Sequence, residues 1–215
     1  MKWFIICALA FSVVSTELSS TPMVFDQKSN DDFILSGEVD IASLVVSPSE
    51  LSRIADEIQR VQTQLDNGTI TEAQAEQRMQ QIVTPLRDSG RRIRDAVLSS
   101  MEPNGEYDMT SSEIDEMSDL DMVAISLIFS GLNQSHELNE DLPVSQGWTT
   151  DQIVGCISSA LGITAVAQII SSTSSLGAVT TQGAIKIFKV VAKRYLGWIG
   201  VAFAAYQFVD CLASL

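Results

Sequence analysis

The hydrophobic positions of residues 47–65 repeat with the period of an α-helix. Apolar side chains recur at alternating intervals of three and four residues, at Leu51, Ile54, Ile58, Val61 and Leu65. This spacing places them on one face of an amphipathic helix, which needs a partner to cover that face. Ser47 and Glu50 stand three residues apart, as in a capping box, and Pro48 suits the first helical position. We therefore predict a helix that begins after Ser47.

A second amphipathic segment follows the turn sequence at residues 66–69. Thr71 and Gln74 repeat the capping pattern, and the apolar positions after them are Met79, Ile82, Leu86, Ile93 and Val97. We expect two antiparallel helices within residues 47–101, the second interrupted near Pro85 and Gly90. The apolar faces of these helices offer a surface to a protein partner.

Residues 102–121 carry eight acidic side chains and lead into an apolar stretch. Paired carboxylates can perform acid–base chemistry. However, Thr110 and Glu113 form another capping pattern, and the helix dipole favours acids in the first turns of a helix. We interpret the acids as the solvated start of one helix and expect Gly131 to end it.

Polar, acidic and turn-forming residues around Pro143 divide the chain. We predict a linker over residues 135–150. It separates an acidic helical segment at residues 47–134 (the acidic segment) from residues 151–215 (the C-terminal module). Residues 16–46 show no sustained helical period, and we predict an extended leader with room for one short strand.

The C-terminal module has almost no polar face. Residues 152–185 contain no charged side chain, although the formal net charge of the chain is -14. Helices that are apolar all round belong in a core or a membrane. We predict two to four helices, over residues 151–161, 164–172, 177 or 182 to 194, and 195–212.

The last two of these segments carry the candidate membrane-binding residues. One face carries Lys186, Lys189 and Lys193, at i, i+3 and i+7, and Arg194 follows them in the sequence. A basic amphipathic helix can lie on an anionic membrane surface, and Trp198 and Tyr206 suit the membrane interface. Small residues at Gly197, Gly200 and Ala204 are spaced for close helix packing. A water-soluble helical core has the same features, with the lysines as its solvated face, so both interpretations stay open.

Residues 1–15 predict a signal peptide, because Lys2 precedes an apolar run over residues 3–14 and small polar residues follow. This run is too short to cross a hydrocarbon core of about 30 Å. Its removal takes Cys7 away and leaves Cys156 and Cys211. We predict a disulfide between these two in a secreted or periplasmic protein, with two buried free thiols as the alternative.

Composition argues against several functions. The chain has 13 basic and 27 acidic residues, so it is unsuited to neutralising the phosphates of a nucleic acid. One histidine, His136, lies in the polar linker, and the turn at Gly68 lacks the carboxylates of a calcium loop. We expect no catalytic site, no metal and no cofactor. Asn67 and Asn133 each begin an Asn-X-Ser/Thr pattern that can accept a glycan.

The stretch AIKIFKVVAKRYLGWIGVAFAAYQFVDC, residues 184–211, resembles the cationic, Gly- and Ala-rich helical peptides of the bacteriocin and antimicrobial group. The resemblance extends over residues 151–215 and implies a precursor in which an acidic part precedes a membrane-active peptide. The C-terminal module has four basic and two acidic residues, a net charge of +2, which leaves -16 for residues 1–150.

Two functions are therefore open for a secreted all-α protein. In the first, the acidic segment pairs with the basic side chains of the C-terminal module and covers its apolar face until secretion is complete, after which the module can bind anionic membranes. In the second, the chain is a non-catalytic interaction domain that binds a partner through the helices of residues 47–101. The sequence leaves the oligomeric state open.

Overall fold

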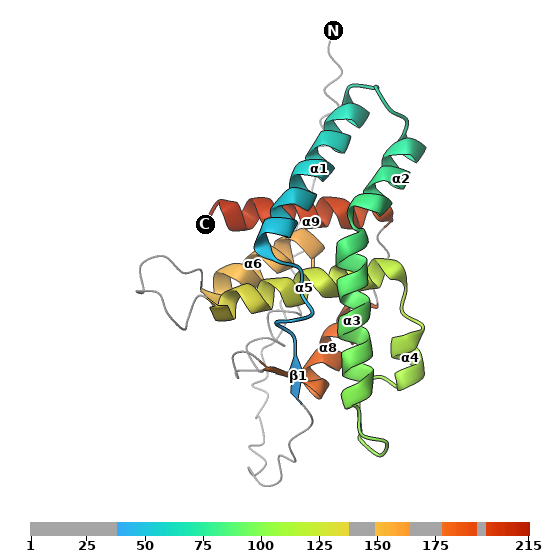
Figure 1. Cartoon of the computed structure of the whole chain (residues 1–215), viewed down its shortest axis with the longest axis vertical. Helices are drawn as coiled ribbons and strands as arrows, with labels where there is room; N and C mark the ends of the chain where they lie inside the picture. The colour runs from blue at the N-terminus through green and yellow to red at the C-terminus, as the bar shows by residue number, and fades with distance from the viewer. Residues whose placement is uncertain (1–37, 138–148, 164–177, 193–196) are drawn as a thin grey trace, which may run out of the picture. The chain divides into compact units, whose positions relative to one another are not determined.

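The structure is a computed structural model that describes residues 38–137, 149–163, 178–192 and 197–215. The predicted all-α class is confirmed: among these residues there are eight helices and two three-residue strands (Figure 1). The elements, in chain order, are β1 (Glu38–Asp40), α1 (Pro48–Asp66), α2 (Glu72–Ile82), α3 (Thr84–Ser100), α4 (Ser111–Asp115), α5 (Asp119–Glu137), α6 (Thr150–Leu161), β2 (Ala178–Thr180), α8 (Thr181–Val191) and α9 (Trp198–Ala213). The predicted signal peptide and the predicted helix over 164–172 lie outside the described residues.

The first two helices form the predicted antiparallel pair. The Glu50 backbone N–H donates to Ser47 Oγ at 3.3 Å, and α1 buries its apolar face at Leu51, Ile54, Ile58 and Val61. The Thr71 side chain and Gln74 form the capping box that begins α2. Capping depends on neighbours in sequence, so these helix starts were predictable.

The break after α2 is real, but Gly90 does not contribute to it. Helix α2 ends at Ile82, α3 begins at Thr84, and Pro85 lies in the first turn of α3. The expected interruption at Gly90 is wrong, because α3 continues through it. Gly90 is buried where α3 crosses α5, and a Cβ atom there would lie 2.0 Å from the carbonyl oxygen of Met122. Glycine is therefore required for the close approach of two backbones.

The expected single helix after Thr110 is two helices. Thr110 and Glu113 form the capping box of α4, which ends at Asp115. Ser118 and Asp121 then make a second reciprocal pair: the Ser118 N–H donates to Asp121 Oδ2 at 2.8 Å, and the Asp121 N–H donates to Ser118 Oγ at 3.3 Å. This pair begins α5 anew.

Gly131 does not end α5, which continues to Glu137. It is buried, and a Cβ atom there would lie 2.9 Å from Phe208 Cζ and 3.0 Å from Ile157 Cδ1. The glycine therefore makes room for α6 and α9 against α5. Part of the predicted linker, residues 135–137, is helical as the last turn of α5, and residues 138–148 lie outside the described residues.

One hydrophobic core includes residues of both the acidic segment and the C-terminal module. Helix α3 packs on α5, and α9 contacts α1, α2, α5 and α6 (Figure 1). Helix α5 lies in the middle of this core, with every side chain from Met122 to Ser130 buried. The end of the leader joins the C-terminal module as well, because β1 pairs antiparallel with β2 in the register Val39 to Val179.

Candidate functional site

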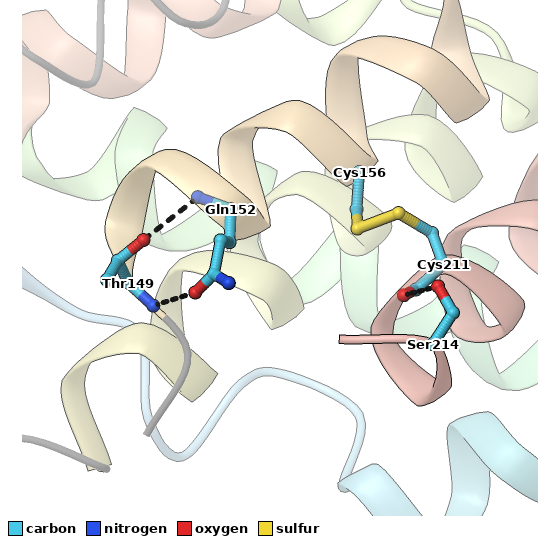
Figure 2. The surroundings of a disulfide bond; sticks show 5 residues. All are labelled: Thr149, Gln152, Cys156, Cys211 and Ser214. Carbon is cyan, nitrogen blue, oxygen red and sulfur yellow. Dashed lines mark hydrogen bonds between the residues drawn. A yellow bond between two sulfur atoms is a disulfide. The ribbon is translucent and has the colours of Figure 1, made fainter. Parts of the chain in front are cut away.

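A disulfide joins the two ends of the C-terminal module, as predicted. Cys156 on α6 is bonded to Cys211 on α9, with their Cα atoms 5.6 Å apart (Figure 2). The Thr149 side chain and Gln152 form the capping box of α6, and Ser214 Oγ donates to the Cys211 carbonyl oxygen at 2.7 Å. Hydrogen bonds thus stabilise the first turn of α6 and the last turn of α9. A structural disulfide is typical of an oxidising compartment.

Helix α8 has the two faces that its sequence predicts. Ile185, Phe188 and Val191 are buried, and Lys186 is exposed. The Phe188 ring meets the Phe129 ring of α5 edge to face, with the centroids 6.3 Å apart. At the start of α8, the hydroxyl groups of Thr181 and Ser100 of α3 are hydrogen-bonded at 2.9 Å. The apolar face of α8 is therefore covered by α3 and α5 in the folded chain.

The basic face of α8 meets the acidic segment at one point. Lys189 Nζ donates to Asp108 Oδ1 at 3.4 Å, and the two side chains are 44% and 39% exposed. A pair this exposed typically contributes less than about 1 kcal/mol. It nevertheless brings a cation of the C-terminal module onto an acid of the acidic segment. Lys193 and Arg194 lie outside the described residues.

Glu113 stands beside the same contact. The backbone N–H and the side-chain hydroxyl of Thr110 both donate to its carboxylate, at 2.7 and 2.9 Å. These hydrogen bonds hold the pKa of Glu113 below its ordinary value, and the positive charge of Lys189 lowers it further. Glu113 is therefore an acid whose ionised form is favoured by both the cap of α4 and the nearby lysine.

This lowered pKa predicts how stability depends on pH. Because the folded-state pKa lies below the unfolded one, ionised Glu113 stabilises the fold above the unfolded pKa, and this contribution is lost as pH falls through the folded pKa. We expect Glu113→Gln to lower the urea midpoint at about pH 6 and to have a smaller effect at about pH 3, because part of the contribution is lost as pH falls. The matched charge change Glu106→Gln is the control. An equal effect of Glu113→Gln at both pH values would contradict the assignment.

Helix α9 carries the predicted aromatic residues and one that the prediction missed. Trp198 and Tyr206 are half-buried, whereas Phe203 is 39% exposed and stacks on Tyr206 with the ring centroids 5.9 Å apart. Phe203 follows Ile199 by four residues and precedes Tyr206 by three, so helical spacing was the signal that could have found it. Ile199, Phe203 and Tyr206 therefore lie along one face of α9.

The small residues of α9 have different surroundings. Ala204 is buried and Gly200 is half-buried. Gly197 is the exposed N-cap of α9, and apart from its chain neighbours a Cβ atom there would meet no atom of the described residues within 4 Å. The expected close helix contact at Gly197 is therefore absent. The glycine with that role is Gly131 of α5, which contacts Phe208 of α9.

Two open grooves border α1 where α2 meets α3, with volumes of about 420 and 540 Å³. Both are lined by Thr84 and Pro85. Arg78 lines the first groove and donates to Gln64 Oε1 at 2.6 Å, and Arg92 lines the second and donates to the Leu44 carbonyl oxygen at 3.1 Å. Among the described residues, neither arginine has a carboxylate partner.

The described residues form neither a metal centre nor a membrane-spanning helix. In the part of the chain that the structure describes, no group of three or more His, Cys, Asp or Glu side chains is placed to hold a metal ion. No helix there combines the length and the apolar character needed to cross a membrane. No protein-family model, curated protein or solved structure matches the chain.

Proposed function

We propose that the protein is exported and that its C-terminal module, residues 151–215, acts on anionic membranes once it is released from the acidic segment. The observation that carries this proposal is the arrangement of α8. Its apolar face is buried against α3 and α5, and its Lys189 pairs with Asp108 of the acidic segment. The apolar face and one lysine of the basic face are thus engaged within the folded chain.

The proposal explains why the resting chain would leave membranes intact. Burial of one large apolar side chain contributes about 1.5–3 kcal/mol, and Ile185, Phe188 and Val191 are all buried in the shared core. For α8 to leave that core, a bilayer must bury these side chains with an equally favourable free energy. Electrostatic attraction adds about 1 kcal/mol for each lysine near an anionic surface, which is too little by itself. Release of the module therefore needs a partner, a cleavage or a change of conditions.

The disulfide would keep α6 and α9 covalently linked after the module leaves the acidic segment. It links α6 to α9 across a sequence separation of 55 residues, so α8 lies between two helices that stay connected. Phe203 and Tyr206 on α9 would then join Trp198 at the membrane interface, where aromatic rings are favoured. In this mechanism the chain is a non-catalytic protein that needs no cofactor.

The contact between Lys189 and Asp108 provides the test. We expect Asp108→Asn to strengthen binding of the full chain to anionic vesicles about fivefold, because it frees one lysine worth about 1 kcal/mol at the surface. Glu106→Gln removes one negative charge from the same loop without touching Lys189 and is the matched control. Co-sedimentation with anionic and neutral vesicles at low and high salt measures the binding. Equal binding by the two variants would contradict the proposal.

A second function is favoured by the two grooves beside α1. They lie along the helices of residues 47–101, and each contains one exposed arginine, Arg78 or Arg92, that has no carboxylate partner among the described residues, which suits an acidic protein partner. In that case the C-terminal module would supply only part of the core. If neither the intact chain nor the isolated module bound lipid, this second function would replace the first.

A further inference from the structure

The two Asn-X-Ser/Thr patterns have different surroundings in the fold. Asn67 follows the last residue of α1, in the turn that leads to α2, and it is exposed together with Gly68 and Thr69. Asn133 lies within α5 and is half-buried. It follows Gly131 by two residues, at a place where α5 is packed against Phe208 and Ile157. A bulky hydrophilic group fits the first position and conflicts with the second.

The turn at Asn67 is held by its backbone alone. The Gly68 N–H donates to the Leu65 carbonyl oxygen, and the Thr69 N–H donates to the Gln64 carbonyl oxygen, both at 2.9 Å. Gly68 has a φ of +67°, which completes the usual helix-ending motif with a left-handed glycine. No hydrogen bond of the described residues uses the side-chain amide of Asn67 or the hydroxyl of Thr69. Both groups of the acceptor pattern are therefore free.

We propose that Asn67 is an N-glycosylation site and that Asn133 is not. The side-chain nitrogen of Asn67 forms a bond to the anomeric carbon of an oligosaccharide carried by a lipid pyrophosphate. The bond from that carbon to the pyrophosphate oxygen breaks, the lipid pyrophosphate leaves, and the amide nitrogen loses one proton. This inference rests on the export of the chain in the proposed function, since the donor is found in a secretory pathway.

The site would place the sugar on the acidic segment only. The C-terminal module contains no asparagine at all, so it has no acceptor of this kind. Asn67 follows the C-terminal end of α1, and the nearby side chains Asp66 and Thr71 are exposed. A glycan would thus increase the solubility of the segment that shields the module and leave the module unmodified.

The experiment is secretion of the full chain, with its own first 15 residues, from a eukaryotic host, followed by mass measurement before and after peptide-N-glycosidase. We expect one glycan on the wild type and on Asn133→Gln, and none on Asn67→Gln or Thr69→Ala. The Thr69→Ala variant keeps the asparagine and breaks only the acceptor pattern. Thermal midpoints equal to that of the enzymatically deglycosylated wild type are expected for the Asn67 and Thr69 variants, because neither side chain makes a hydrogen bond to a described residue.

The outcomes separate this inference from the proposed function. A secreted chain without a glycan at Asn67, or with one at Asn133, overturns the glycosylation site and leaves the membrane proposal untouched. A chain that stays inside the cell with residues 1–15 still attached overturns export, and with it both proposals. A glycan at Asn67 supports the site without bearing on membrane activity.

Discussion

Replacing Gly90 with alanine is expected to lower the free energy of unfolding by about 3 kcal/mol. The new Cβ atom would lie 2.0 Å from the carbonyl oxygen of Met122 and 2.6 Å from its carbonyl carbon. Both are backbone atoms of α5, so no side chain can rotate away, and α3 must move off α5. Urea denaturation of the full chain measures the change. Helix propensity alone predicts the opposite sign, because alanine is a better helix former than glycine by about 1 kcal/mol.

Gly155→Ala provides the control for this prediction. Gly155 lies within α6, is exposed, and has no atom within 4 Å of its Cβ position. There the substitution is expected to stabilise the protein by about 0.5–1 kcal/mol, through helix propensity alone. If Gly90→Ala proved neutral or stabilising as well, the close crossing of α3 and α5 would be wrong.

Removal of the disulfide is the second change with a large expected effect. The double variant Cys156→Ala, Cys211→Ala should lose ~4 kcal/mol, because the bond closes a loop with a sequence separation of 55 residues. Cys156 is buried in the core, so some additional packing is lost there. Thermal unfolding of the oxidised wild type and of the double variant measures the difference.

Reduction of the wild type supplies an independent check on the disulfide. A thiol reductant should bring the unfolding midpoint of the wild type close to that of the double variant and leave the double variant unchanged. If the reductant altered neither protein, the two cysteines would not be bonded in the secreted chain.

The helix starts could be predicted from sequence because capping is local. Ser47, Thr71 and Thr110 each accept a hydrogen bond from the residue three positions later, as their spacing indicates. The cap missed by the prediction, Ser118 with Asp121, follows the same pattern. Asp121 is one of eight acids in residues 102–121, and the prediction assigned all eight to the start of one helix. The signal was present, and the error lay in treating the acidic stretch as a single unit.

The two buried glycines could not be interpreted from local sequence. Gly90 and Gly131 both look like helix breakers, yet each lies inside a helix at a close contact. Whether a glycine interrupts a helix or admits a neighbouring one depends on what packs against it. For Gly131 that neighbour includes Phe208, 77 positions further along the chain. Periodicity within one helix contains no information about such a partner.

In the candidate site, too, local sequence predicted the faces of a helix but not the segments that pack against them. Helical spacing correctly placed Ile185, Phe188 and Val191 on one face of α8 and Lys186 on the other. The sequence did not reveal that α3 and α5 cover the apolar face, or that Asp108 is the acid that reaches Lys189. Asp108 lies 81 positions before Lys189, and Phe129 of α5 lies 59 positions before Phe188. The composition suggested that acids shield the module, and the structure supplies a specific contact for this hypothesis.

Dye release from vesicles distinguishes a shielded membrane-active module from one that only supplies part of the core. Oxidised residues 147–215 and the intact secreted chain would be compared on anionic and on neutral lipid at the same concentration. We expect the fragment to release dye from anionic vesicles, with less release at high salt, and the intact chain to release little. Absence of both leakage and binding for the fragment, or equal leakage by the two species, would contradict a membrane-active module shielded by the acidic segment.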